Sequence, residues 1–336
     1  MHKDHPGREV VGRNYTARVV KRVLLASPRG YCAGVERAVD TVEKLLDLHG
    51  PPVYVRKQIV HNAHVVRDLE ARGAIFVDDE REVPEGETVV LSAHGVAPSV
   101  YRNAEERLLN TIDATCPLVT KVHVQARRYA ADGYTILLIG HAGHEEVVGT
   151  MGEASESTIL VQSVADAEAL DLPPDARVAY ITQTTLSVDE TGEIITALRR
   201  RFPHIRAPKK EDICYATSNR QWAVKDLLEE VDLLLVIGSG NSSNSNRLVE
   251  VARANGVASH LIDDETDIDE AWLEGVETVG LTSGASAPER LVDRVCDWFR
   301  VRGVGDISAH RVVDEDVEFR LPVELRRELA LAEAQR

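Results

Sequence analysis

The sequence predicts an α/β protein made of three similar units in a pseudo-threefold, trefoil-like arrangement. Short apolar strands alternate with amphipathic helices along the chain, which is typical of parallel α/β units. Three widely spaced cysteines, Cys32, Cys116 and Cys214, each stand where a loop gives way to a helical pattern. A strand opens at a similar distance after each of them: 21 residues on at Val53, 19 at Thr135 and 19 at Leu233.

The first unit spans residues 21–115 and follows a polar, unpatterned N-terminal tail of residues 1–20. Its opening run, 23–27, is β-branched and aliphatic and predicts a strand. From Val35 to Leu46 apolar residues recur at helical spacing, and Gly50 with two prolines ends that helix. The same patterns predict a helix at 64–73 and strands at 53–55, 74–77 and from residue 88.

The second unit spans residues 116–210. Pro117 suits the first turn of a helix, where its missing N–H is no loss. A buried type of strand follows at 135–140, and a second strand at 177–185 runs into a polar loop. The helix over 187–202 begins at Ser187 or Asp189, both good capping residues.

The third unit spans residues 211–302 and repeats this order. It has an amphipathic helix to about residue 231, a strand at 233–238, and a polar loop that leads into a helix stopped by glycine. A short strand at 260–263 precedes the last strand, loop and helix, at 278–299. Residues 303–336 are predicted to be an appended C-terminal tail with one helix.

Composition narrows the classes of function. The 336 residues carry a net charge of −16, which argues against broad nucleic-acid binding because that needs a basic face. No apolar run approaches the roughly 18 residues of a membrane span, and the N-terminus lacks the apolar core of a signal peptide. We therefore expect a cytoplasmic protein without a membrane segment, whose four cysteines are free thiols, metal ligands or catalysts.

The cysteines divide into two kinds. A single buried cysteine is most often a small apolar residue without chemistry, and Cys296, within an apolar helical stripe, fits that description. The other three precede helices, whose N-termini favour the thiolate form that binds metals. Separations of 84 and 98 residues exclude a local zinc knuckle and suit a site assembled between units. Thiolates select iron–sulfur clusters, zinc or cuprous copper, and a four-iron cluster held by only three cysteines has one open iron.

Polar loops follow the predicted strands, at the edge where open α/β sheets bind their ligands. Hydroxyl, amide and imidazole groups together with helix N-termini can hold an anion such as a diphosphate without lysine or arginine. Each loop alone is ordinary turn chemistry, but several of them converge with three thiols. No GxGxxG and no Walker A sequence supports a dinucleotide or ATP site. The candidate donors are His61, Asn62, His94, His141, His144, Gln183, Thr184, Thr185, Ser242, Ser243, Asn244 and Ser286.

Glu146 stands in one of these loops, beside two histidines. It is either a proton donor or an ordinary solvated glutamate, and composition alone leaves both open. Burial near a cluster would raise its pKa and equip it as a general acid.

At this point the motifs resemble those of the 4-hydroxy-3-methylbut-2-enyl diphosphate reductase family of the non-mevalonate isoprenoid pathway. The matching stretches run in order from about residue 22 to 300, and neither terminal tail is included. Two departures are Glu145, where a more variable residue is expected, and Ser283, where alanine is usual. The stretches are RGYCAGV, IVHN, AHGV, DATCP, GHEEVVGTMGE, TQTTLS, DICYATSNRQ, SGNSSNSNRL and TSGASAPE.

The resemblance implies a central 4Fe–4S cluster on Cys32, Cys116 and Cys214, whose open iron meets the substrate hydroxyl. It implies a two-electron reductive dehydroxylation that gives isopentenyl and dimethylallyl diphosphate. Glu146 and Thr184, with His144, would serve proton transfer at the reacting carbon. The diphosphate contacts that it implies are His61, His94, His144, Ser242, Ser243, Asn244 and Ser286.

Such an enzyme needs an electron donor of the ferredoxin or flavodoxin type. These donors are usually acidic and would be repelled by the overall charge. One basic run ends just before Cys214, and we expect it to be the landing patch. The alternative is a set of ordinary cations near the C-terminus of a helix. The run consists of Arg199, Arg200, Arg201, Arg206, Lys209 and Lys210.

Two other functions remain to be weighed. A zinc hydrolase would hold its metal with the three thiolates and a water molecule and would be colourless. An iron–sulfur redox sensor would use the cluster as a switch, but it has no need of a phosphate pocket.

Overall fold

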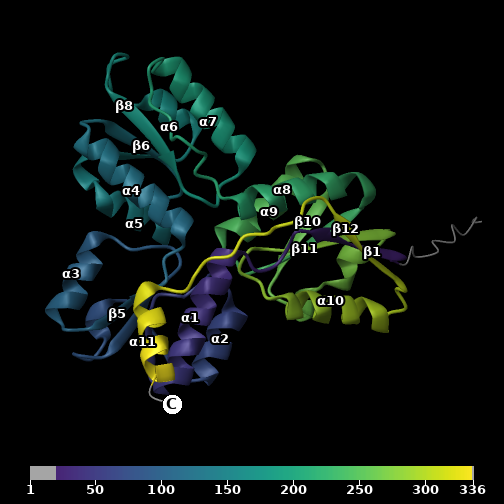
Figure 1. The fold of residues 1–336 in the computed structure, drawn as a ribbon. Coiled ribbons are helices and arrows are strands. Elements are labelled where there is room, and N and C mark those ends of the chain that lie inside the picture. The colour runs from purple at the N-terminus through teal and green to yellow at the C-terminus, as the bar shows by residue number, and fades with distance from the viewer. Residues whose placement is uncertain (1–19, 335–336) are drawn as a thin grey trace, which may run out of the picture.

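The structure is a computed structural model that describes residues 20–334. Three α/β lobes meet near the N-terminal end of the helix that follows Cys32 (Figure 1). The predicted N-terminal tail lies outside the described residues except for its last residue, Val20. Within residues 20–334, no helix combines the length and apolar character needed to cross a bilayer.

Each lobe is formed by the helices and strands that follow one cysteine. The first has α1 (Ala33–His49), β2 (Val53–Arg56), α2 (Ala63–Ala71), β3 (Ala74–Val77), β4 (Thr88–Leu91), α3 (Pro98–Glu106) and β5 (Asn110–Asp113). The second has α4 (Pro117–Ala131), β6 (Thr135–Ile139), α5 (Glu145–Glu153), β7 (Thr158–Val161), α6 (Val164–Ala169), β8 (Val178–Thr182) and α7 (Val188–Arg201). The third has α8 (Tyr215–Leu227), β9 (Leu233–Ile237), α9 (Ser243–Ala254), β10 (Ala258–Ile262), β11 (Thr278–Ser283) and α10 (Glu289–Val301).

The three sheets repeat one strand order. The first strand after each cysteine is central, which gives β3-β2-β4, β7-β6-β8 and β10-β9-β11, with every pairing parallel. These central strands begin at the three predicted residues, Val53, Thr135 and Leu233. β9 is buried along its whole length, as expected of a parallel strand covered on both faces. The predicted class of three similar α/β units is confirmed.

The segment before each cysteine occupies a fourth position in a sheet. β5 precedes Cys116 and pairs with β4, and Arg206, before Cys214, bridges to Ala179 in β8. β1 (Arg22–Ser27) precedes Cys32, and it pairs with β11 of the third lobe. The chain thus completes the sheet of one unit, passes a cysteine and starts the helix of the next unit, in a closed ring.

This ring corrects one prediction about the first unit. Residues 21–27 were expected within it, as part of 21–115, but β1 belongs to the sheet of the third lobe. The sequence cannot reveal this, because strand partners so far apart in the chain leave no local pattern. The boundaries 116–210 and 211–302 remain proposals.

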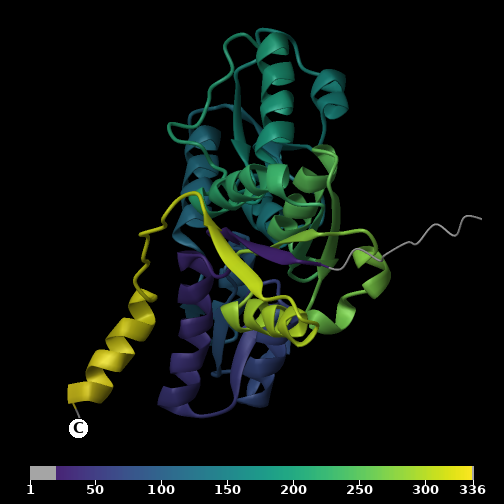
Figure 2. The same cartoon turned by 90° about the vertical axis from the view of Figure 1, so that its right-hand side faces the viewer.

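The C-terminal segment, 303–336, is more than the expected tail with one helix. The helix exists as α11 (Val323–Ala334), but β12 (Asp306–Arg311) also pairs with β1 along its length. Figure 2 shows β12 beside β1, and the chain then crosses toward the first lobe. Leu325 of α11 is fully buried in the core of that lobe. The segment therefore joins two lobes.

Cys296 is 3% exposed on α10, within the apolar core of the third lobe. Its prediction as a core residue is confirmed.

Candidate active site

Three cysteines occupy equivalent positions where the lobes meet. Cys32, Cys116 and Cys214 are the N-cap residues of α1, α4 and α8. The backbone N–H of each donates to a carbonyl in the loop after the third strand of a neighbouring sheet. In the same order, the acceptors are Ala285 at 3.2 Å, Ala93 at 3.0 Å and Thr184 at 3.1 Å. The pseudo-threefold relation thus extends to individual hydrogen bonds.

All three thiols line one central cavity. Burial raises the pKa of Cys116 to about 12 and that of Cys214 to about 11, and the charge of Cys32 adds to both shifts. Thiolates gathered in a cavity of low polarity repel one another, so they ionise together only when a cationic group lies between them. This donor set fits a thiolate-bound metal group.

Gly34, in the first turn of α1, leaves space for the sulfur atoms. A Cβ at this position would lie 2.6 Å from Sγ of Cys116 and 3.9 Å from Sγ of Cys32. Within residues 20–334, no group of three or more His, Cys, Asp or Glu side chains is placed to hold a single metal ion. A cluster of several irons needs no such group, because each thiolate binds a different iron. The three-thiolate zinc site does need one and gains no support from the described residues.

Three histidines form a second part of the cavity wall, which we call the histidine cluster: His61, His94 and His144. The rings of His61 and His94 stack with centroids 3.9 Å apart, and that of His144 lies 5.4 Å and 5.9 Å from theirs. Burial lowers the pKa of His61 and of His144 to about 4, and it lowers that of His94 well below the usual value. Nε2 of His61 and Nδ1 of His94 are buried without a hydrogen-bond partner in the described structure. The imidazoles are therefore neutral and available to a ligand.

Hydroxyl and amide groups complete the cavity wall, at the N-terminus of α9 and in the loop after β11. Ser242 is the N-cap residue of α9, and Asn244 accepts a 2.9 Å hydrogen bond from the N–H of Ala285. Ser243 Oγ donates to the carbonyl of Thr185 at 2.9 Å. Ser286 Oγ donates at 2.8 Å to the carbonyl of His61, so the third lobe contacts the histidine cluster directly. A helix N-terminus flanked by such donors can bind an anion.

Glu146 is 2% exposed and belongs to the cavity, which favours the proton donor over the solvated glutamate. Its Oε1 accepts from the N–H of Thr184 at 2.6 Å, and its Oε2 lies 3.0 Å from Thr184 Oγ1. Burial raises its pKa from 4.5 to about 7, although the bonds from Thr184 oppose the shift. A carboxyl group of this pKa holds a proton near neutral pH and is suited to donate it.

The three cysteines, Glu146 and nine of the twelve predicted donors line this one cavity, whereas Asn62, His141 and Gln183 do not. Prediction missed Gly34 and Thr217. Thr217 contacts the cavity thiol of Cys214: its N–H lies 3.4 Å and its Oγ1 3.2 Å from Sγ. The sequence did hold a signal for Thr217, because it lies three residues after the capping cysteine. This is the N3 position of the helix, which faces the N-cap side chain.

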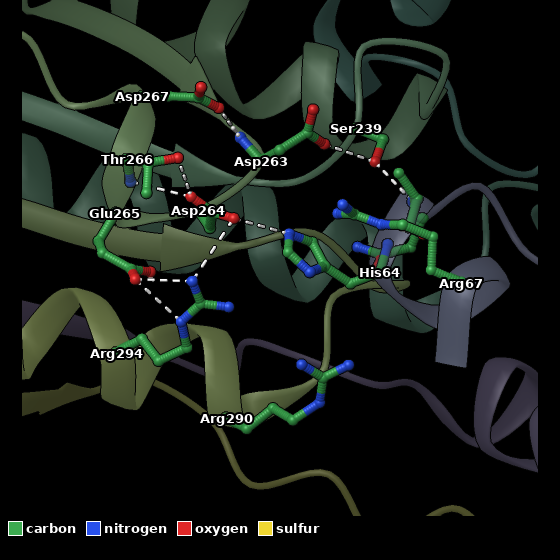
Figure 3. Close-up of polar contacts among 12 residues, drawn as sticks. His64, Arg67, Ser239, Asp263, Asp264, Glu265, Thr266, Asp267, Arg290 and Arg294 are labelled. Atoms are coloured by element: carbon green, nitrogen blue, oxygen red, sulfur yellow. Dashed lines mark hydrogen bonds and ion pairs between the residues drawn. The ribbon is translucent and has the colours of Figure 1, made fainter. Parts of the chain in front are cut away.

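Figure 3 shows a polar network between the start of α2 and residues of the third lobe. The first N–H of α2 donates to Ser239 Oγ at 3.0 Å, and Ser239 Oγ donates to Asp263 at 2.7 Å. His64 Nε2 lies 3.0 Å from Asp264, which is also 3.6 Å from Arg294 of α10. The network fixes α2 of the first lobe to the third lobe, and nothing local in the sequence indicates it.

The cations of the predicted basic run differ in their contacts. Arg200 pairs with Glu168 at 3.0 Å, and Arg201 donates to the carbonyls of Glu168 and Leu170. One groove is lined by three of the six cations, Arg199, Lys209 and Lys210.

The fold and cavity define a class of three-lobed α/β enzyme, with thiols and anion-binding groups around a shared centre. The family model described as "LytB protein" matches residues 23–300. The chain belongs to the LytB family.

Relatives named 4-hydroxy-3-methylbut-2-enyl diphosphate reductase are similar over nearly the whole chain. The one from Acidothermus cellulolyticus is 63% identical over 92% of this chain and 91% of its own. The one from Mycolicibacterium paratuberculosis is 59% identical over 91% and 92%. The solved E-1-hydroxy-2-methyl-but-2-enyl-4-diphosphate reductase of Plasmodium falciparum is 38% identical, with a TM-score of 0.88 over 94% of this chain and 99% of that one.

Proposed function

We propose that this protein reduces 4-hydroxy-3-methylbut-2-enyl diphosphate to isopentenyl and dimethylallyl diphosphate, the last step of the non-mevalonate pathway. The observation that carries the proposal is the convergence of three equivalent thiols, a proton donor and an anion-binding wall on one cavity. Family membership supports it, since the relatives bear this enzyme's name.

The cofactor of the proposal is a 4Fe–4S cluster on Cys32, Cys116 and Cys214. When bound, it would supply electrons and one iron without a protein ligand for the substrate's hydroxyl oxygen. The N-cap positions of the thiols favour this, because helix N-termini stabilise thiolate charge.

The remaining roles belong to the chain itself. The histidine cluster and the hydroxyls of Ser242, Ser243 and Ser286, with Asn244, hold the diphosphate and fix the position of the substrate. An imidazole that gains a proton on binding adds charge to its hydrogen bond, which strengthens the grip. In the free protein, burial lowers the pKa of His61 and of His144, so both imidazoles are neutral. The negative charge of the bound diphosphate opposes this effect and stabilises a protonated imidazole.

Glu146 and Thr184 deliver the proton that the leaving hydroxyl needs. The Thr184 hydroxyl both accepts and donates, so it can take a proton from the Glu146 carboxyl and pass one into the cavity. Cleavage of the C–O bond then releases water. A second proton with the two electrons completes an allylic product, and protonation at either end of the allyl system explains two products.

Glu146→Gln tests this assignment, with Glu145→Gln as its matched control. Glu145 is the neighbouring carboxylate of α5 and is absent from the cavity lining. We expect Glu146→Gln to keep its iron content and its affinity for diphosphate but to lose about 10²–10⁴-fold in turnover. Glu145→Gln should retain turnover. Near-normal turnover by Glu146→Gln would remove that carboxyl from the mechanism.

The proposal includes a partner and a location. A small reduced protein of the ferredoxin or flavodoxin type supplies the electrons. The cytoplasm suits the enzyme, because none of the four cysteines forms a disulfide and thiols stay reduced there.

A further inference from the structure

We infer that a basic groove between α7 and α8, together with the exposed Trp222 of α8, is the docking surface for a small acidic electron-donor protein. The inference rests on the proposed reductase function, which consumes two electrons in each turnover. Residues of β8, α7, the segment 207–213 and the start of α8 line the groove. Figure 1 shows α7 and α8 where the second and third lobes approach each other.

The groove is positive, although the whole chain carries a net charge of −16. Its cations Arg199, Lys209 and Lys210 are exposed, and none forms an ion pair within the described structure. Among the described lining residues the carboxylates are Glu211 and Asp212, and Asp212 is buried with Lys121 at 3.1 Å. An acidic protein is repelled by the rest of the surface and attracted here, which steers it to this place.

The wall between the groove and the central cavity is thin. In three separate segments, one side chain faces the groove and a close neighbour in sequence faces the cavity. Since electron transfer weakens steeply with distance, a donor seated in this groove lies on a short route to the thiol-bound centre. The groove and cavity members of these pairs are Thr182 with Thr184, Ile213 with Cys214, and Ser218 with Thr217.

The floor of the groove is fixed to the helices that carry two of the cluster thiols. Lys121 of α4 donates to the carbonyls of Lys210 at 3.0 Å and Glu211 at 2.7 Å. α4 begins after Cys116, and the segment itself runs into Cys214. A partner bound here therefore meets a surface already ordered around the centre, which limits the entropy lost on docking.

Trp222 supplies the apolar anchor that a docking site needs. It lies on α8 one turn after Ser218, on the same face, and is 52% exposed. Exposed tryptophan is among the residue types enriched at interface hot spots. Trp222 does not line the central cavity, so the proposed chemistry gives it no role.

The test compares two reductants on the cluster-loaded enzyme. One is a purified, reduced flavodoxin of negative net charge, and the other is dithionite with methyl viologen, which needs no docking site. The variants are Lys209→Glu with Lys210→Glu, and Trp222→Ala. Arg326→Glu with Arg327→Glu is the matched control for charge, because α11 lies at the opposite end of the molecule (Figure 2).

We expect the double variant Lys209→Glu with Lys210→Glu to have a flavodoxin-driven kcat/KM that is roughly tenfold or more below wild type at low salt. The salt dependence of this kcat/KM should also be lost. Trp222→Ala should lower flavodoxin-driven kcat/KM but leave its dependence on salt concentration unchanged. Viologen-driven turnover should be unchanged in both variants, and the arginine control should behave as wild type. Flavodoxin-driven rates and salt slopes equal to wild type in the lysine pair would overturn the inference.

The two reductants separate this inference from the proposed function. A wild-type enzyme inactive even with viologen would refute the reductase, whereas a viologen-active lysine variant with normal flavodoxin kinetics would refute only the docking surface. If the double glutamate variant loses viologen-driven turnover, the double variant Lys209→Gln with Lys210→Gln takes its place. Its flavodoxin-driven kcat/KM and salt dependence are then compared with wild type in the same way.

Discussion

Gly34→Ala is a steric test of the thiol site. The glycine lies in the first turn of α1, outside the positive-φ region, so alanine suits the backbone. The added Cβ would lie 2.6 Å from Sγ of Cys116, where an ordinary contact needs about 3.4 Å. The sulfur must therefore move by about 0.8 Å. Metal–ligand bonds tolerate only about 0.2 Å, so we expect the variant to lose most of its cluster.

The effect on the fold should be smaller than the effect on the cluster. Crowding a packed site costs about 1–3 kcal/mol, and replacing a helical glycine by alanine returns about 0.5–1 kcal/mol. The apoprotein should thus lose roughly 1 kcal/mol of unfolding free energy and remain folded. Denaturant unfolding of the apoprotein measures this directly.

The assay is iron and sulfide per chain after anaerobic reconstitution. Gly192→Ala is the matched control, because Gly192 also lies in a helix, α7, and its added Cβ would meet no atom within 4 Å. The control should bind as much iron as wild type and gain about 0.5–1 kcal/mol in stability. Full iron and sulfide in Gly34→Ala would refute the idea that the sulfurs converge beside this glycine.

Three further predictions follow from burial and charge. The pKa of Glu146 is raised from 4.5 to about 7, so the wild-type apoprotein loses unfolding free energy as pH rises through that window. The glutamine of Glu146→Gln does not titrate. The unfolding free energy of this variant, measured by urea unfolding, should therefore rise by roughly 3 kcal/mol relative to that of wild type between pH 4.5 and 7. A difference that stays constant with pH would contradict this. Inorganic diphosphate should bind with proton uptake, and hence more weakly as pH rises, because the histidine cluster is neutral when no ligand is bound. Calorimetry in two buffers of different ionisation enthalpy measures the protons taken up, and His94→Asn should take up fewer than wild type. Equal proton uptake by the variant and wild type would count against the assignment. Glu315→Ala should cost about 3 kcal/mol, because it leaves the fully buried Arg220 without its 3.0 Å partner; a loss below about 1 kcal/mol in chemical unfolding would argue against that clamp.

Local patterns allowed much of the fold to be predicted. The register of the three cysteines and their central strands was visible because apolar strands and loop residues repeat at similar offsets. The place of β1 was not, since it pairs with β11, about 250 residues away, and the sequence gives no sign of the ring. β12 was missed because the polar stretch DISAHR is a mostly exposed edge strand without clear alternation.

The site divides in the same way. Residues with reactive or donor groups were predicted from their loops, but the groups that position them were not. From the sequence, Arg220 on α8 is expected to be an ordinary exposed helical cation. In the structure it is fully buried and donates to the carbonyl of Gly30 at 2.7 Å, two residues before Cys32. Its partner Glu315 comes from the expected tail. Such contacts depend on tertiary structure, which no local pattern encodes.

The most direct measurement is the conversion of 4-hydroxy-3-methylbut-2-enyl diphosphate by the anaerobically reconstituted protein with dithionite and methyl viologen. The account predicts isopentenyl and dimethylallyl diphosphate together, in an amount that tracks cluster content. No product from protein that holds a full complement of iron and sulfide would contradict it.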